Sequence, residues 1–284
     1  MEEKKDEVVF IQREEEVWAG KSWQLLSALR NRCPLIQCIT NFVSMDMMAN
    51  TLLAAGASPA MLHCLQEISD FTPHAGALCV NIGTLTAEWV HSMKAAAALC
   101  TQLRKPWVLD PVAVSASEFR MKACLELVGL RPSVIRGNAS EIIALSSASM
   151  SLTKGVDSSD ESTDAVDAAK SLSQTSGAIV AVSGAIDIVT DGKQVIGIHN
   201  GVAMMQLITA TGCAVTALIA AFVAVNPSNA LEATAAALAI FAVAGELGME
   251  KSSGPASLRM HMIDSLHGLD EATILSRVHI HSLS

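Results

Sequence analysis

The chain carries no charged residue between Lys193 and Glu232, and this uncharged stretch limits the folds that the sequence can adopt. Its most apolar part is 210-ATGCAVTALIAAF-222. A segment of this kind either spans a membrane or forms a helix in the core of a protein. Residues 204–225 are long enough to cross a bilayer, which needs about 20 apolar residues.

The details of this segment favour a buried helix. Gln206, Thr209, Thr211 and Gly212 interrupt its first half, and the strictly apolar part, residues 213–225, has the length of a core helix. No basic cluster flanks the segment to orient it in a membrane. We therefore expect a core helix and no association with a membrane.

Short apolar runs alternate with helical patterns along most of the chain, and the region after Gly201 is almost wholly helical. This alternation predicts one α/β domain with a mainly parallel sheet covered on both faces. Residues 1–15 are highly charged, so we expect a flexible N-terminal extension before a single domain at 16–284. Residues 147–165 are rich in Ser, Thr and Asp and predict a surface loop, and Asp191-Gly192 predicts a hairpin turn. Strands are expected at residues 35–40, 57–62, 77–82, 106–112, 133–136, 178–183, 186–190 and 194–199, and helices at 17–32, 45–55, 86–103, 142–146 and 164–175.

Charge and cysteine content restrict the partners and the compartment. The net charge is -9 and no basic stripe occurs, which argues against nucleic acid. The start, MEEKKDEVVF, is too charged for a signal or transit peptide. The seven cysteines form no CxxC or Cys/His metal spacing. Six of them lie in apolar runs, where we expect small hydrophobic side chains, so a reducing, cytoplasmic setting is predicted.

Polar residues follow most of the expected strands. In open α/β sheets, ligands bind beyond the carboxyl ends of the strands, so these residues are candidates for a shared site. They are Thr40-Asn41, Asn81 with Gly83-Thr84, Asp110, Arg136-Gly137-Asn138 and Ser183-Gly184.

The sequence 210-ATGC-213 leads directly into the long apolar helix. The first N–H groups of a helix have no internal partners, and the helix dipole adds partial positive charge there, so this end suits a phosphate. Gly212 allows a close approach of a ligand, and the pKa of a Cys213 thiol in the first turn is expected to be lowered. The alternative is that Thr209 or Thr211 only caps the helix and Cys213 packs in the core.

The segment 136-RGNASE-141 offers a second group of candidates. Asn138 and Glu141 have the spacing of a capping box, and Glu141 could equally hold a hydrated Mg²⁺. Arg136 ends an apolar strand, where its guanidinium requires a phosphate or a carboxylate. Asp110 is either a cap acceptor or a second outer-shell group for Mg²⁺. Walker A, GxGxxG and GxSxG sequences are absent.

Six segments in order resemble the hydroxyethylthiazole kinase family: 34-PLIQCITNFV-43, 56-GASPAM-61, 81-NIGTL-85, 109-LDPVAV-114, 135-IRGNASE-141 and 211-TGC-213. The resemblance covers the chain from about residue 20. It implies a ribokinase-like three-layer α/β/α fold and phosphorylation of the hydroxyethyl arm of 4-methyl-5-(2-hydroxyethyl)thiazole in thiamin salvage. It also implies ATP as phosphate donor, Mg²⁺ as cofactor, and a homotrimer with thiazole sites between subunits.

The resemblance also implies roles for individual residues. The Mg²⁺ and phosphate motif is carried over to Asn138 and Glu141, with Asp110 helping. Nucleotide-binding positions match Arg136 and Ser183, and the transferring phosphate and catalysis match Thr211, Gly212 and Cys213. The thiazole-contacting position matches Met61, with Asn41 in the same pocket and Ala210 at its border.

The chain departs from the family pattern at four positions. Ala210 stands where Gly is usual, Ser115 where Gly is common, Ala185 where Glu is frequent and Ile188 where Tyr is frequent. A kinase for another small alcohol, such as hydroxymethylpyrimidine, and a non-catalytic nucleotide-binding regulator therefore remain alternatives. A Cys-nucleophile hydrolase would need a histidine beside Cys213, and the candidates are His63, His74, His91 and His199.

Overall fold

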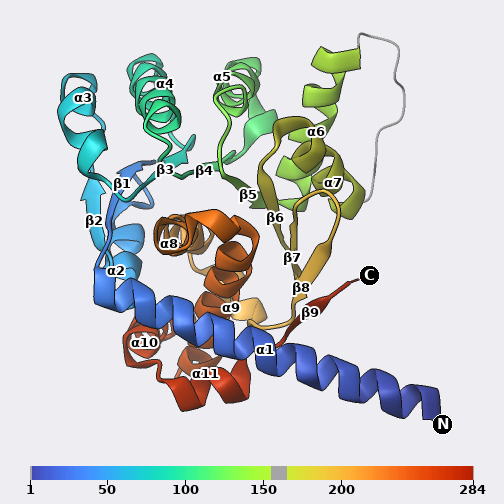
Figure 1. The fold of residues 1–284 in the computed structure, drawn as a ribbon. Coiled ribbons are helices and arrows are strands. Elements are labelled where there is room, and N and C mark those ends of the chain that lie inside the picture. The colour runs from blue at the N-terminus through green and yellow to red at the C-terminus, as the bar shows by residue number, and fades with distance from the viewer. Residues whose placement is uncertain (1, 155–164, 284) are drawn as a thin grey trace.

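A single twisted sheet organises the computed structural model, which describes residues 2–154 and 165–283. Its strand order is β2-β1-β3-β4-β5-β6-β7-β8-β9 (Figure 1). The strands from β2 to β6 are parallel, and β7, β8 and β9 continue the sheet with antiparallel pairings. The strands are β1 (Leu35–Ile39), β2 (Ser58–Met61), β3 (Ala77–Asn81), β4 (Trp107–Asp110), β5 (Val134–Asn138), β6 (Ile179–Ser183), β7 (Asp187–Thr190), β8 (Val195–Ile198) and β9 (Ile280–Ser282).

Helices cover both faces of the sheet, so the predicted three-layer α/β/α architecture with a mainly parallel sheet is confirmed (Figure 1). One layer contains α3 (Ile68–Phe71), α4 (Ala87–Gln102), α5 (Glu118–Val128), α6 (Ala139–Lys154) and α7 (Ala165–Ser176). The other contains α1 (Glu2–Arg32), α2 (Met45–Ala55), α8 (Thr211–Val225), α9 (Ala230–Met249), α10 (Pro255–Gly268) and α11 (Glu271–Arg277). Each layer has its own buried cluster, because successive residues of a strand point to opposite faces: Cys79 of β3 belongs to the second layer's cluster, and Leu78 and Val80 to the first layer's.

Helix α8 confirms the core-helix prediction. From Ala214 onward its side chains are buried, apart from a half-buried Ala224, and Thr211, Gly212 and Val215 near its start line a cavity. Within the described part of the chain, one helical segment, Pro227–Met249, is long and apolar enough to cross a membrane. However, 78% of its most apolar window is buried inside the protein. It is the central helix of the second layer, packed against α8 and α10.

Several boundaries differ from the sequence expectations. The first helix begins at Glu2 rather than at residue 17, and Glu14 accepts hydrogen bonds from the N–H and hydroxyl of Ser282. Helix α6 continues to Lys154, so the first part of the expected 147–165 loop is helical; residues 155–164 lie outside the described residues. Strand β9 was not expected, because three residues after a helical region carry little signal of their own. The division into an extension and one domain stays a prediction.

Six cysteines were expected to be buried, and the structure buries only four of them. Cys38, Cys79, Cys100 and Cys124 are buried, as small hydrophobic side chains would be. The expectation is wrong for Cys33 and Cys64, which are exposed. Cys33 directly follows α1, and Cys64 follows the strand β2 in a short connection, so both lie where the chain returns to the surface.

Candidate active site

Helix α8 begins at the carboxyl ends of the strands without a side-chain cap. Ala210, the residue before its first turn, has a φ of 68° and makes no capping hydrogen bond. The hydroxyl of Thr211 instead donates to the carbonyl oxygens of Met205, at 3.2 Å, and Ile208, at 3.1 Å. The alternative in which Thr209 or Thr211 caps the helix is therefore wrong. The N–H groups of the first turn are left for a ligand.

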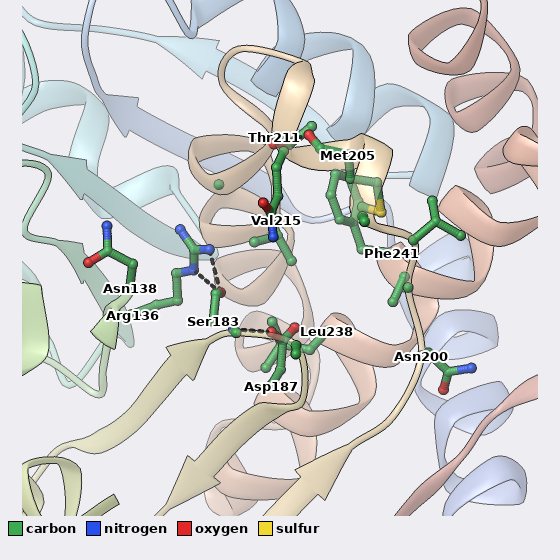
Figure 2. Close-up of a pocket in the computed structure, with 18 residues that line it drawn as sticks. Arg136, Asn138, Ser183, Asp187, Asn200, Met205, Thr211, Val215, Leu238 and Phe241 are labelled. Atoms are coloured by element: carbon green, nitrogen blue, oxygen red, sulfur yellow. Dashed lines mark hydrogen bonds between the residues drawn. The ribbon is translucent and has the colours of Figure 1, made fainter. Parts of the chain in front are cut away.

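Arg136 of β5 lies against this helix start (Figure 2). A Cβ atom added to Gly212 would lie 2.7 Å from Nη1 of Arg136. The guanidinium donates from Nε, at 3.1 Å, and from Nη2 to the hydroxyl of Ser183 at the end of β6. It is only 9% exposed and takes part in none of the ion pairs recorded for the described residues. A buried cation whose recorded hydrogen-bond partner is a neutral hydroxyl, beside the positive end of a helix, favours an anionic ligand.

The predicted capping box at the start of α6 is confirmed. Asn138 Oδ1 accepts from the N–H of Glu141 at 2.9 Å, and Glu141 Oε2 accepts from the N–H of Asn138 at 2.9 Å. The other oxygen, Oε1, accepts from the N–H of Ala113 at 2.8 Å, in the connection after β4. One carboxylate thus joins two strand-end loops, and each of its oxygens keeps a second lone pair.

Asp110 is buried at the end of β4 with 1% exposure. Its Oδ2 accepts from Asn81 Nδ2 at 2.9 Å and from the hydroxyl of Thr216 on α8 at 2.8 Å, while Oδ1 has no hydrogen-bond partner. Burial raises its pKa to about 7, and the charge of Arg136 opposes that rise. Its recorded partners are side chains, so the alternative of a cap acceptor is wrong. In its ionised form, a carboxylate with an unpaired buried oxygen is suited to a positively charged ligand.

Cys213 lies between the helix start and the ends of two strands. Its sulfur is 3.2 Å from Asn81 Nδ2 and 3.5 Å from Asn41 Nδ2. Burial, followed by the negative charge of Asp110, raises the pKa of the thiol. The expectation of a lowered pKa is therefore wrong. The thiol is the stable form near neutral pH, which argues for a positioning role over proton abstraction.

A cavity of about 490 Å³ opens beside these residues (Figure 2). Polar and cationic groups line one part of it: Arg136, Asn138, Ser183, Thr211 and Gly212. Apolar side chains line another: Met205, Val215, Leu238, Phe241 and Ala242. The volume falls in the usual range for small-molecule sites, and the division suits a ligand with an anionic end and a flat apolar end.

Five of the eleven predicted site residues line this cavity: Arg136, Asn138, Ser183, Thr211 and Gly212. Met61 ends β2 and pairs in register with Cys38, and it does not line this cavity. Asn41 reaches the site only through Cys213 and Asn81. Sequence reasoning missed Thr216, whose lone hydroxyl inside an apolar helix was the available signal.

Asp187 was also missed. It lines the cavity and accepts from the N–H of Gly184 at 2.9 Å, and burial raises its pKa. Nothing in its local sequence separates it from an ordinary turn residue.

The histidine needed for a Cys-nucleophile hydrolase is not beside Cys213. The recorded partners of its sulfur are two amides, and His63 hydrogen-bonds to the backbone of Thr40 while its ring lies 4.4 Å from that of Trp89. His199 stacks on His281 near β9. The hydrolase alternative therefore lacks its catalytic base.

The fold and site define the class: a mainly parallel three-layer α/β/α protein of the ribokinase-like type, with an anion-receiving helix start at the strand ends. A ribokinase-like superfamily protein from Enterococcus faecalis has the same fold, with a TM-score of 0.57 and 13% identity over 82% of this chain and 86% of that one. The hydroxyethylthiazole kinase family model matches residues 26–272, and the chain belongs to that family.

Individual relatives agree with this assignment. The chain is 67% identical over 267 residues to a hydroxyethylthiazole kinase of Arabidopsis thaliana, covering 94% of this chain and 97% of the relative. The solved structure of a hydroxyethylthiazole kinase protein from Pyrococcus horikoshii OT3 superimposes with a TM-score of 0.85 at 35% identity. It covers 93% of this chain and 99% of that one. The resemblance stated from six sequence segments is confirmed, and with it the predicted class of enzyme, a phosphotransferase with an alcohol acceptor.

Proposed function

We propose that the protein transfers the γ-phosphate of ATP to the hydroxyl of 4-methyl-5-(2-hydroxyethyl)thiazole, a step of thiamin salvage. The single observation that carries the proposal is the pairing of Arg136 with the uncapped start of α8. A mostly buried guanidinium lies beside a helix start whose first N–H groups have no side-chain cap. Phosphoryl transfer depends chiefly on positioning and on stabilising charge at such a point.

The cavity suggests how the nucleotide lies. The phosphates would be held by Arg136, Ser183 and Asn138, with the γ-phosphate against the N–H groups of Thr211 to Cys213. The purine would then occupy the apolar part near Val215 and Phe241. This orientation places the negative phosphates beside the positive guanidinium and the flat purine ring beside apolar side chains.

The donor set also fits Mg²⁺ held through water. Among the described residues, no group of three or more His, Cys, Asp or Glu side chains is placed to bind a metal directly. Asp110 keeps an unpaired oxygen, and both oxygens of Glu141 already accept backbone N–H groups. Carboxylates in this state suit the water shell that Mg²⁺ retains. When bound, the ion would supply positive charge to the phosphate oxygens.

The substrate alcohol would lie on the other side of the α8 start. Cys213 faces it, Asn41 holds the sulfur, and Met61 and Ala210 would border the thiazole. Because burial raises the pKa of Cys213, we propose that the thiol orients the alcohol rather than removing its proton. The alcohol proton can then pass late, to an oxygen of the transferred phosphate, as the new O–P bond forms and the bond to the leaving ADP breaks.

We also propose a homotrimer in the cytoplasm. Phe42 and Val43 are 67% and 60% exposed, directly after Asn41, and Leu207 is 70% exposed shortly before Ala210. Exposed apolar side chains beside a substrate site favour coverage by a second copy of the chain. The seven cysteines are all free thiols, which supports a reducing compartment.

The proposal is tested by offering the purified protein ATP and Mg²⁺ with hydroxyethylthiazole and, in parallel, hydroxymethylpyrimidine. Mass spectrometry then detects phosphorylated product. Phosphate on the thiazole supports the proposal. Phosphate on the pyrimidine alone would show that the substrate is the pyrimidine and not the thiazole. No product with either, while ATP still binds, supports a regulator.

Matched variants locate the activity. Arg136→Met should lose about 10- to 100-fold in kcat/KM, since a hydrogen bond to a charged group is removed. Lys94→Met removes a surface cation that pairs with Glu126, and should keep wild-type activity. Equal activity of the two variants would reject the anion site at Arg136.

A further inference from the structure

Asn81 has no assigned role in the reaction, although it lies at the centre of the site. It is the last residue of β3 and has 0% exposure. Its Oδ1 accepts from Asn41 Nδ2 at 2.8 Å and from the N–H of Gly83 at 3.0 Å. Its Nδ2 donates to Asp110 Oδ2 at 2.9 Å and lies 3.2 Å from Cys213 Sγ. Both hydrogens and both acceptor lone pairs of the amide are therefore used.

This arrangement fixes the orientation of the amide. A flipped Asn81 would point its NH₂ at the amide nitrogen of Asn41 and the N–H of Gly83, and its oxygen at the Asp110 carboxylate. All three contacts would become repulsive or empty, at a cost that is high for buried groups. One hydrogen of Asn81 is thus directed at the carboxylate and the other at the sulfur.

The direction of the second hydrogen determines on which side of the sulfur the thiol hydrogen of Cys213 lies. Its sulfur receives two amide donors, from Asn81 and from Asn41, so both contacts use sulfur as an acceptor. A thiol that accepts on its buried side keeps its own hydrogen for the open side. Under the proposed function, that side would face the substrate alcohol.

We propose that Asn81 is a positioning residue that holds the sulfur of Cys213 at a fixed place relative to Asp110. This inference rests on the proposed function. A single planar amide spans the two groups, so the metal-side carboxylate and the alcohol-side thiol cannot move apart independently. Asn81 acts on the reaction through Cys213 and contacts neither substrate.

A purely structural role is the competing explanation, and Thr216 provides the matched control. Its hydroxyl shares one hydrogen between the same Asp110 oxygen, at 2.8 Å, and the carbonyl oxygen of Gly212, at 3.0 Å. Thr216→Val therefore removes one donor from Asp110 and leaves the donors of Cys213 in place. Asn81→Ala removes a donor from both groups.

The experiment is a double-mutant cycle with Cys213→Ala, using phosphorylation of the thiazole. With Cys213 present, Asn81→Ala should lower kcat about tenfold while the KM for ATP changes less than about twofold. In the Cys213→Ala background the same change should lower kcat less than about threefold. Thr216→Val should have equal effects in both backgrounds. Equal factors for Asn81→Ala in the two backgrounds would overturn the proposal.

A second measurement needs no turnover and separates this inference from the proposed function. Iodoacetamide labelling is followed by peptide mass spectrometry, with the exposed Cys64 as internal reference. Loss of the Asn81 donor should lower the labelling rate of Cys213 relative to Cys64 by about threefold, because hydrogen bonds to sulfur favour the thiolate. An unchanged ratio, or the same change in Thr216→Val, counts against it. If Asn81→Ala does not fold, Asn81→Ser replaces it in both measurements.

Discussion

Gly212 and Arg136 are in contact at the point where α8 meets the sheet: a single added methyl carbon on Gly212 would lie 2.7 Å from Nη1 of Arg136. The glycine therefore permits a guanidinium and a helix start to share one small space. The distance also explains why a residue with any side chain would separate the two sources of positive charge. Both are needed at the same place to receive a phosphate.

Gly212→Ala should displace the guanidinium and weaken its hydrogen bonds to Ser183. We expect kcat/KM for ATP to fall about 10- to 100-fold, in line with a misplacement of about 1 Å in an active site. Steady-state kinetics measure the change. Gly20→Ala is the control, because no atom lies within 4 Å of its added Cβ. Equal kinetics for the two variants would show that the contact between Gly212 and Arg136 does not affect the reaction.

Cys213→Ala should retain measurable turnover. The raised pKa of the thiol leaves little thiolate near neutral pH to act as a base, so the loss in kcat should be smaller than the roughly 10²–10⁴-fold that a general base contributes. Cys213→Asp should also stay active, because a carboxylate at this position can accept the proton of the alcohol. Kinetics on both variants, with circular dichroism as the folding control, decide the matter. A folded but wholly inactive Cys213→Asp would argue against this position for the substrate alcohol.

Glu141→Gln should weaken the response to Mg²⁺. The change removes a negative charge and leaves one acceptor oxygen for the two N–H groups of Ala113 and Asn138. The Mg²⁺ concentration for half-maximal activity should rise about tenfold or more, as for other outer-shell ligands. Glu126→Gln, which only breaks a surface pair with Lys94, should leave the Mg²⁺ titration unchanged. A parallel shift in both variants would indicate a general charge effect.

Ala210→Gly should stabilise the protein, unlike most alanine-to-glycine changes. Ala210 has a φ of 68°, a left-handed conformation that costs a side-chain-bearing residue about 1–2 kcal/mol. The greater freedom of glycine in the unfolded chain offsets part of the gain, so we expect a net increase of up to about 1 kcal/mol. Ala98→Gly, on the exposed face of α4, should cost about 1 kcal/mol. Thermal unfolding of both variants and of the wild-type protein tests whether the first change raises the free energy of unfolding and the second lowers it.

Acid should loosen the edge of the sheet at β8 and β9. The rings of His199 and His281 stack with centroids 4.2 Å apart, and burial, then the charge of His281, lowers the pKa of His199. The folded protein thus favours neutral His199, so its contribution to stability is present above the unfolded pKa of about 6.5 and is lost as the pH falls below it. His279 adds to the repulsion, and Glu15 opposes it.

His281→Gln should reduce this acid sensitivity. Between pH 7.5 and 5, we expect its Tm to fall by about 2–4 °C less than that of the wild-type protein. His74→Gln, a change at an exposed histidine in the connection before β3, is the control. Identical pH profiles for His281→Gln and wild type would show that the stacked histidines do not cause the loss of stability in acid.

Sequence patterns predicted the sheet well because its parallel strands are buried on both faces and form continuous apolar runs. The residues at the strand ends could also be found, since Arg136, Asn138 and Asp110 interrupt or end such runs. The direction of the pKa shift of Cys213 could not be predicted from the sequence. It depends on the burial of the first turn of α8 and on the charge of Asp110, more than a hundred residues away in the chain, and neither is encoded near the cysteine.

Other features were hidden because they depend on contacts that are distant in sequence. The role of Asn81 as a junction becomes visible only when β1, β3, β4 and α8 are placed together. Strand β9 exists because β8 offers it a partner, since three residues could not form a strand alone. The capping box at Asn138 and Glu141, by contrast, is local, and its spacing was sufficient to predict it.

The pairing of β8 with β9 has a consequence for how the protein is made. Four helices, α8 to α11, separate these neighbouring strands in the sequence. A ribosome must therefore release the outer strand of the sheet, and all four helices, before β8 can be covered. Until then the nascent chain carries an open edge of unpaired N–H and C=O groups, which other strands can join. The interval between the synthesis of β8 and that of β9 is thus one in which this edge is open to aggregation.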